Sequence, residues 1–287
     1  MEFRTVVEIP EPAFQIAPCE EMLLVGSCFA DRMGSRFKDE QFRVTVNPYG
    51  VMYNPVSVCH TVQRVLQENQ TFRPTTAMMT LGTNHVYVEK ETGEVVDNCR
   101  KRPQYLFEER ELTVDECADW LKKTIILLRN VQPDIRIVIT VSPIRYAKYG
   151  FHGSQLSKAT LLLAVHQILK ELKDTNAQGK ACVEYFPAYE LILDELRDYR
   201  FYAADMLHLS DQAVEYVHER FAEKYFTADT KQFLKEWGTI KKVLDHRPFN
   251  PDSEEYRALI DKTMEKVAAL TKKYPTFVFD YQSWQCL

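Results

Sequence analysis

Residues 22–30 carry the clearest sign of chemistry in this sequence. They form the stretch MLLVGSCFA, an apolar run that stops at Gly26 and is followed by two nucleophile-capable side chains, Ser27 and Cys28. In α/β enzymes, a buried strand that ends in a tight glycine turn exposes the next side chains at the carboxyl edge of the sheet. The first N–H groups of the following helix stabilise negative charge there. The stretch is therefore typical of a site that presents a nucleophile.

A base for this nucleophile is available far along the chain, in Asp205 and His208. A loop carboxylate three residues before a histidine can hold Nδ1–H of the imidazole and leave Nε2 free to take a proton. The Asp-x-x-His spacing also occurs by chance, and it then marks an exposed turn. Both interpretations stay open on the spacing alone.

The segments that must position these residues alternate between strands and helices. Strands are predicted at residues 21–25, 43–46, 135–141 and 181–185, and helices at about 27–38, 55–66, 114–128 and from 154 onward, with another from Ser210 or Asp211 to Phe226. This alternation is typical of a three-layer α/β/α sandwich with a mostly parallel sheet. Such a sheet binds ligands at the carboxyl ends of its strands.

Two segments of this sandwich need separate predictions. Residues 76–98 are expected to form a hairpin inserted at the edge of the sheet, with a turn at residues 91–94. In the helix that begins near Ser154, the 3.6-residue period predicts a core-facing stripe. Its expected members are Leu156, Ala159, Leu163, Val165, Leu169 and Leu172.

The last part of the chain carries no chemical motif. Residues 230–273 are predicted to be helical, with Pro248 and Pro251 dividing the helices. The sequence therefore predicts one α/β domain over residues 1–226 and a helical C-terminal extension over residues 227–287.

The composition narrows the class of partner and the compartment. A net charge of −5 over 287 residues gives no bulk attraction to phosphate backbones, so nucleic acid is not expected as a partner. No apolar run approaches the roughly 20 residues that cross a bilayer, and no cationic leader opens the chain, so we expect a cytoplasmic protein without a membrane partner. Seven scattered cysteines suit a reducing compartment. The sequence has no paired Cys or His spacing typical of a metal site, so no metal is expected.

Short motifs spread over residues 20–225 resemble the GSCFA family, whose proteins are similar to the SGNH/GDSL hydrolase superfamily. Residues 26–30 have the sequence GSCFA. The other motifs are NPYG at residues 47–50, YNP at 53–55, LGT at 81–83, VSP at 141–143, SKA at 157–159, YFPAYE at 185–190 and DYRFY at 198–202. The resemblance implies an SGNH-type sandwich and the hydrolysis or transfer of an acyl group through a covalent acyl-enzyme, with O-acylated carbohydrate as a candidate substrate.

The resemblance also implies roles for the residues of the first and last motifs. The superfamily's first motif begins Gly-Asp-Ser with serine as the nucleophile, and alignment from Gly26 puts Cys28 in the serine position. This implies a catalytic group of Cys28, His208 and Asp205, in which His208 and the field of the helix N-terminus generate the thiolate. Ser27 as the nucleophile is the main alternative. A third interpretation is a tight turn with a buried cysteine.

Two residues are candidates for holding an oxyanion beside the N–H of Cys28. The superfamily's second motif contributes a glycine N–H, which Gly50 could supply unless it only permits a turn. Its third motif, Gly-x-Asn-Asp, is similar to residues 82–85 and implies a role for Asn84. In the predicted hairpin, however, the Asn84 side chain would face solvent.

Two further residues are candidates for substrate binding. Arg145 and His152 follow the strand that ends at residue 141, where they could hold an anionic part of a substrate. Each could equally be a solvated charge at the start of a helix, the interpretation favoured for Lys158. The aromatic segments 185–189 and 199–202 form either a wall on which sugars stack or part of the core packing.

These residues leave the reaction and the partner open. The predicted function is an acyl-ester hydrolase or an acyltransferase that needs no cofactor, although acyl-CoA is the expected donor for a cytoplasmic transferase. Its partner would be a small-molecule or glycan acyl ester, and the sequence gives no sign of an oligomeric state. The alternative is a non-catalytic ligand-binding module on the same fold. A thiol-redox protein is disfavoured because Cys28 has no resolving cysteine nearby in the sequence.

Overall fold

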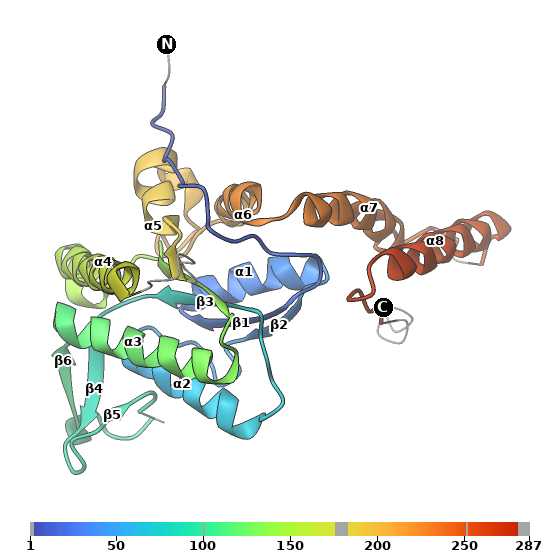
Figure 1. The fold of residues 1–287 in the computed structure, drawn as a ribbon. Helices are drawn as coiled ribbons and strands as arrows, with labels where there is room; N and C mark the ends of the chain where they lie inside the picture. The colour runs from blue at the N-terminus through green and yellow to red at the C-terminus, as the bar shows by residue number, and fades with distance from the viewer. Residues whose placement is uncertain (1–2, 100, 176–182, 251, 281–287) are drawn as a thin grey trace.

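The computed structural model describes residues 3–99, 101–175, 183–250 and 252–280. Its centre is a five-stranded sheet in the order β2-β1-β3-β7-β8, with every neighbouring pair parallel (Figure 1). The strands are β1 (Glu21–Gly26), β2 (Arg43–Val46), β3 (Thr76–Leu81), β7 (Arg136–Val141) and β8 (Val183–Tyr185). The predicted α/β class with a mostly parallel sheet is confirmed, while residues 181–182 of the predicted last strand lie outside the described residues.

Helices cover both faces of this sheet and complete the sandwich (Figure 1). One face carries α2 (Pro55–Glu68), α3 (Val114–Val131) and α4 (Gly150–Thr175), and the other carries α1 (Cys28–Asp39), α5 (Ala188–Glu190) and α6 (Asp211–Tyr225). Because side chains alternate along a strand, Leu23 and Val25 enter the first core and Met22 and Leu24 enter the second. Short 3₁₀ or π turns lie at Gln104–Leu106, Ala147–Tyr149, Leu191–Leu196 and Tyr199–Phe201.

The prediction for residues 76–98 is wrong in its first part. β3 is a central strand between β1 and β7, and all six of its residues are buried. The strand ends before Gly82, and the N–H groups of Gly82 and Thr83 donate to the Tyr53 carbonyl. Only β4 (His85–Glu89) and β5 (Val95–Val96) form the hairpin, and β4 also pairs with β6 (Phe107–Glu111) in a separate antiparallel sheet (Figure 1).

The buried face of α4 also differs from the predicted stripe. Leu156 and Leu163 are 54% and 57% exposed. The face that packs against the sheet begins instead with polar side chains and continues with apolar ones. Its buried members are Ser154, Ser157, Lys158, Leu161, Ala164, Val165 and Ile168. The polar members are buried because loops at the carboxyl edge of the sheet supply hydrogen-bond partners for them.

The C-terminal extension is helical as predicted, with α7 (Ala228–Leu244) and α8 (Glu254–Lys273) reaching away from the sandwich (Figure 1). Its own apolar cluster includes Phe233 and Trp237, and the Trp237 Nε1–H donates to the Asp39 carbonyl at 2.8 Å. The boundary at residue 226 stays a prediction. Among the described residues, none of the helices combines the length and the apolarity needed to cross a membrane.

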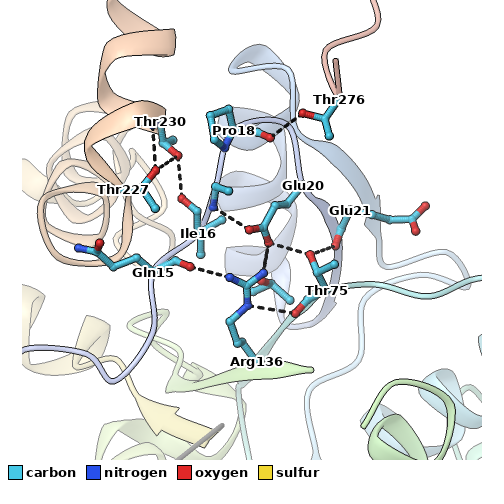
Figure 2. A network of polar contacts seen from close by, with 12 residues as sticks. Gln15, Ile16, Pro18, Glu20, Glu21, Thr75, Arg136, Thr227, Thr230 and Thr276 are labelled. Carbon is cyan, nitrogen blue, oxygen red and sulfur yellow. Dashed lines mark hydrogen bonds and ion pairs between the residues drawn. The ribbon is translucent and has the colours of Figure 1, made fainter. Parts of the chain in front are cut away.

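A polar network at the amino ends of the strands ties this extension to the sheet (Figure 2). Arg136 at the start of β7 forms an ion pair with Glu20 and donates to the Thr75 carbonyl. The Thr230 hydroxyl of α7 donates to the Ile16 carbonyl at 2.7 Å. The network fixes the segment before β1. It lies at the amino ends of the strands, away from the carboxyl ends where a site is expected.

Candidate active site

The turn after β1 is shaped by a glycine and closed by a serine. Gly26 has a φ of 144°, and its N–H donates to Asn47 Oδ1 at 2.9 Å. Ser27 is the N-cap of α1 and is only 1% exposed. Its Oγ accepts from the Phe29 N–H and lies 3.0 Å from Thr80 Oγ1. The Ser27 hydroxyl is therefore occupied within the turn.

Gly26→Ala is expected to lower the free energy of unfolding by roughly 2–6 kcal/mol. An added Cβ would lie 2.1 Å from the Thr80 carbonyl oxygen, and overpacking and backbone strain each cost roughly 1–3 kcal/mol. Urea denaturation measures the change. The matched control is Gly238→Ala in α7, where the new Cβ meets nothing and stability is expected to rise by up to about 1 kcal/mol. Wild-type stability of Gly26→Ala would contradict this description of the turn.

Cys28, the first residue of α1, faces a cavity of about 420 Å³. The cavity is also lined by His208 and by Ile144, which follows β7. Burial raises the pKa of the Cys28 thiol, while a hydrogen bond with Tyr53 acts in the opposite direction. Burial and the neighbouring thiol also raise the pKa of Tyr53 to about 12, so its hydroxyl keeps its proton and donates to the sulfur. The field of the helix start therefore does not by itself produce the expected thiolate, and Cys28 needs a base.

The loop before α6 brings Asp205 and His208 together. Asp205 Oδ2 lies 2.6 Å from His208 Nδ1, while Oδ1 accepts the N–H groups of Leu207 and His208. The bond to the His208 side chain, followed by these two main-chain bonds, lowers the pKa of Asp205 to about 2. A carboxylate can only accept, so Nδ1 carries the proton and Nε2 of the neutral ring is left as an acceptor. The pair has the geometry of an oriented general base.

Arg145 holds this loop in place. Its main-chain N–H donates to the Leu207 carbonyl at 3.0 Å, and its Nη1 donates to the Met206 carbonyl at 2.9 Å. The guanidinium also lies over the Phe151 ring, 4.0 Å from its centroid. Arg145 therefore stabilises the loop, whether or not it also binds the substrate. His152, by contrast, is exposed on α4 and does not line this cavity.

The two oxyanion candidates are both occupied by local hydrogen bonds. Gly50 has a φ of 95°, and its N–H donates to the Asn47 carbonyl at 2.9 Å, which fits the turn role. Asn84 is 1% exposed, so the expectation that it faces solvent is wrong. Its Nδ2 donates to the Leu112 carbonyl at 2.8 Å, and its N–H donates to Ser157 Oγ. Asn84 anchors the start of the hairpin between the two sheets.

The aromatic segments divide between packing and a second cavity. Phe186 is fully buried, and Tyr185 donates its hydroxyl hydrogen bond to Glu190. Tyr199, in contrast, is 68% exposed and lines a cavity of about 430 Å³ together with Tyr202. The first segment is therefore packing, and the second is a wall of a cavity.

The sequence did not indicate two residues of the site. Tyr53 was noted only as part of a motif, and Lys158 was expected to be a solvated charge. Lys158 is instead 2% exposed, and its Nζ donates to the carbonyls of Gly82 and Ser142. The adjacent Ser157 is also buried, and its Oγ accepts the N–H of Asn84. This turn of α4 therefore faces the sheet with polar side chains.

Several solved structures are similar to this chain at low sequence identity. An acetyl esterase mutant with acetate ion is 10% identical, with a TM-score of 0.44 over 76% of this chain and 99% of that chain. A member of the lipolytic protein G-D-S-L family from Veillonella parvula is 12% identical, with a TM-score of 0.43 over 71% and 96%. An acetylxylan esterase mutant from Geobacillus stearothermophilus is 11% identical, with a TM-score of 0.42 over 75% and 98%. No curated protein matches the chain.

The family comparison covers most of the chain. The model of the GSCFA family matches residues 21–78 and 68–221, a span that includes Cys28 and His208. A second model, GSCFA domain protein, C-terminal domain, matches residues 237–282. The sandwich and the extension are thus both matched, and the chain belongs to the GSCFA family.

Proposed function

We propose that the protein hydrolyses or transfers an acyl group through a thioester on Cys28. One observation carries the proposal: Cys28 and His208 line the same cavity, while Asp205 binds Nδ1 of the His208 ring. A thiol, an imidazole and an orienting carboxylate are the three parts of a nucleophile activated by a base. Ser27 is the weaker candidate, because its hydroxyl is buried and caps α1.

The proposed reaction begins with a neutral thiol. As Cys28 Sγ attacks the ester carbonyl, the S–H bond breaks and the proton passes to His208 Nε2, giving an imidazolium that Asp205 stabilises. The N–H groups at the start of α1 support the negative charge on the carbonyl oxygen. When that intermediate collapses, the imidazolium returns the proton to the leaving alkoxide and the thioester remains.

The second half of the reaction repeats these roles with a new nucleophile. His208 Nε2 takes a proton from water, or from the hydroxyl of an acceptor molecule, as that oxygen attacks the thioester. Collapse expels the thiolate, which recovers the proton from the imidazolium. Water gives an esterase, whereas a second hydroxyl gives an acyltransferase, with acyl-CoA as one donor for the first half.

The alcohol part of the substrate is proposed to occupy the second cavity. The two cavities are neighbours along two chain segments: Ile144 lines the first and Arg145 the second, and Ala203 lines the first and Tyr202 the second. The second cavity combines the exposed Tyr199 ring with guanidinium and carboxylate side chains. Sugars present apolar C–H faces and many hydroxyls, so an O-acylated carbohydrate fits this lining.

Tyr199→Ala is expected to raise KM for an acetylated xylo-oligosaccharide by roughly three- to tenfold, the value of one stacking contact. KM for 4-nitrophenyl acetate, which has no sugar to stack on Tyr199, is expected to stay within about twofold. Tyr105→Ala is the matched control, because Tyr105 is 74% exposed and lines neither cavity. Equal changes in KM for the two substrates would contradict a sugar site at Tyr199.

The experiment that tests the proposed function measures acetate release from both substrates, with and without acetyl-CoA and a free xylo-oligosaccharide. Release of acetate supports an esterase, and acetylated sugar formed from acetyl-CoA supports a transferase. Binding of the oligosaccharide with no turnover of any ester would overturn the proposal and support the non-catalytic binding module.

A further inference from the structure

Lys158 is a buried cation that the proposed reaction has not yet used. It lies on α4, and its Nζ donates to the carbonyl oxygens of Gly82 at 2.6 Å and of Ser142 at 2.8 Å. Within the described part of the chain, no carboxylate forms an ion pair with it. A buried ammonium without a carboxylate is costly, so its retention at this place calls for a reason other than stability.

The place is the carboxyl edge of the sheet, next to Cys28. Gly82 follows β3 and Ser142 follows β7, and these strands pair to their last residues, Leu81 with Val141. β1, which leads to Cys28, pairs with β3 up to Gly26. Lys158 therefore bridges the end of β3, which lies beside β1, and the end of β7, the next strand along.

Tyr53 also links Lys158 to the Cys28 thiol, through hydrogen bonds. Its hydroxyl bonds to Cys28, and its carbonyl accepts the N–H of Gly82, the residue whose own carbonyl receives Lys158 Nζ. An added Cβ at Gly82 would lie 2.8 Å from the Tyr53 ring, so the contact requires glycine. The four residues form one packed unit at this edge.

The charges of this unit act on one another. Burial lowers the pKa of Lys158 to about 7, and Cys28 acts to raise it. In return, Lys158 acts to lower the pKa of Cys28, against burial and the nearby Asp31 carboxylate. The Tyr189 ring also lies close, with its centroid 6.0 Å from Lys158 Nζ. A thiolate at Cys28 and an ammonium at Lys158 therefore stabilise each other.

We propose that Lys158 is a positioning residue of this site, whose ammonium is held by two strand-end carbonyls and stabilises the Cys28 thiolate. The step is the one described above: the S–H bond breaks, the proton goes to His208 Nε2, and the electron pair stays on sulfur. Lys158 acts in its protonated form and transfers no proton in this step. The proposal rests on Cys28 being the nucleophile of the proposed function.

The first test measures the rate of iodoacetamide alkylation of Cys28 against pH, without any substrate. Lys158→Met keeps the aliphatic stem and is expected to slow alkylation at neutral pH by roughly three- to tenfold and to shift the profile to higher pH. Lys170→Met is the matched control, because Lys170 is an exposed lysine on the same helix. Rates for a folded Lys158→Met protein within about twofold of the control would overturn the proposal.

A second test does not depend on the folding of a Lys158 variant. The pH titration of the Lys158 Cε resonance is followed by NMR in Cys28→Ala and in Cys28→Asp, whose carboxylate carries the negative charge of a thiolate. The expected result is a higher midpoint for Lys158 in Cys28→Asp than in Cys28→Ala, and equal midpoints would overturn the coupling. Neither test needs an ester substrate. An active enzyme with uncoupled residues defeats only this proposal, and a coupled pair without turnover defeats only the proposed function.

Discussion

Replacing Cys28 with alanine is expected to lower kcat for ester hydrolysis by at least about 10⁴-fold, because removing the nucleophile of a catalytic group removes most of its rate enhancement. The protein is expected to stay folded, since the Cys28 side chain is only half-buried at the edge of a cavity. Steady-state kinetics with 4-nitrophenyl acetate measure the loss. Circular dichroism checks the fold.

The neighbouring serine supplies the matched control for this prediction. Ser27→Ala removes an N-cap and is expected to cost about 1 kcal/mol of stability, while kcat stays within severalfold of wild type. Cys59→Ala removes a fully buried thiol elsewhere and should likewise keep activity. The opposite pattern, an active Cys28→Ala and an inactive Ser27→Ala, would exchange the two roles.

His208→Ala is expected to lower kcat by about 10²- to 10⁴-fold, the range supplied by a general base. Asp205→Asn should lower it by about 10²-fold or more, because an amide can donate to Nδ1 and stabilise the wrong tautomer. Both variants should keep KM close to wild type, since neither residue binds the substrate in its ground state. The measurement is kcat and KM on the same aryl ester.

A different histidine serves as the control here. His152→Ala changes an exposed residue of α4 that lines neither cavity, so its kcat is expected to match wild type. If His152→Ala lost activity while His208→Ala kept it, the geometry around Asp205 would have no catalytic meaning.

Much of the fold could be predicted because local signals agree with the tertiary structure. The apolar run before Gly26 is a buried strand, and Ser210 caps α6 as its residue type suggests. The pattern failed for β3. Its run TAMMTL is short and directly precedes a true hairpin, so only the pairing with β1 and β7 distinguishes a central strand from an edge.

For the site too, relations between residues close in the sequence could be predicted, and those that depend on the tertiary structure could not. Asp205 and His208 meet because they are three positions apart in one loop, which is a local relation. The choice between Ser27 and Cys28 depends on the direction in which the turn projects each side chain, and two adjacent residues do not reveal it. In the structure, the first is buried as a cap and the second lines the cavity.

Lys158 shows why the other residues of the site could not be predicted from the sequence. A lysine on an amphipathic helix is normally assigned to the solvent face. The predicted stripe was therefore right for Val165 and wrong for Leu156 and Leu163. Its acceptors are carbonyls at the ends of β3 and β7, which only the assembled sheet brings to one place. Asn84 is buried for the same reason, since its acceptor Leu112 lies beyond the hairpin.

Trapping of the acyl-enzyme tests the central claim most directly. The protein is mixed with a slowly deacylating aryl ester, quenched in acid and digested, and the peptide that contains Ser27 and Cys28 is sequenced by mass spectrometry. The account predicts an acyl group on the Cys28 sulfur that neutral hydroxylamine removes and that is absent from Cys28→Ala. An acyl group on the Ser27 oxygen, or turnover with no acylated peptide, would contradict it.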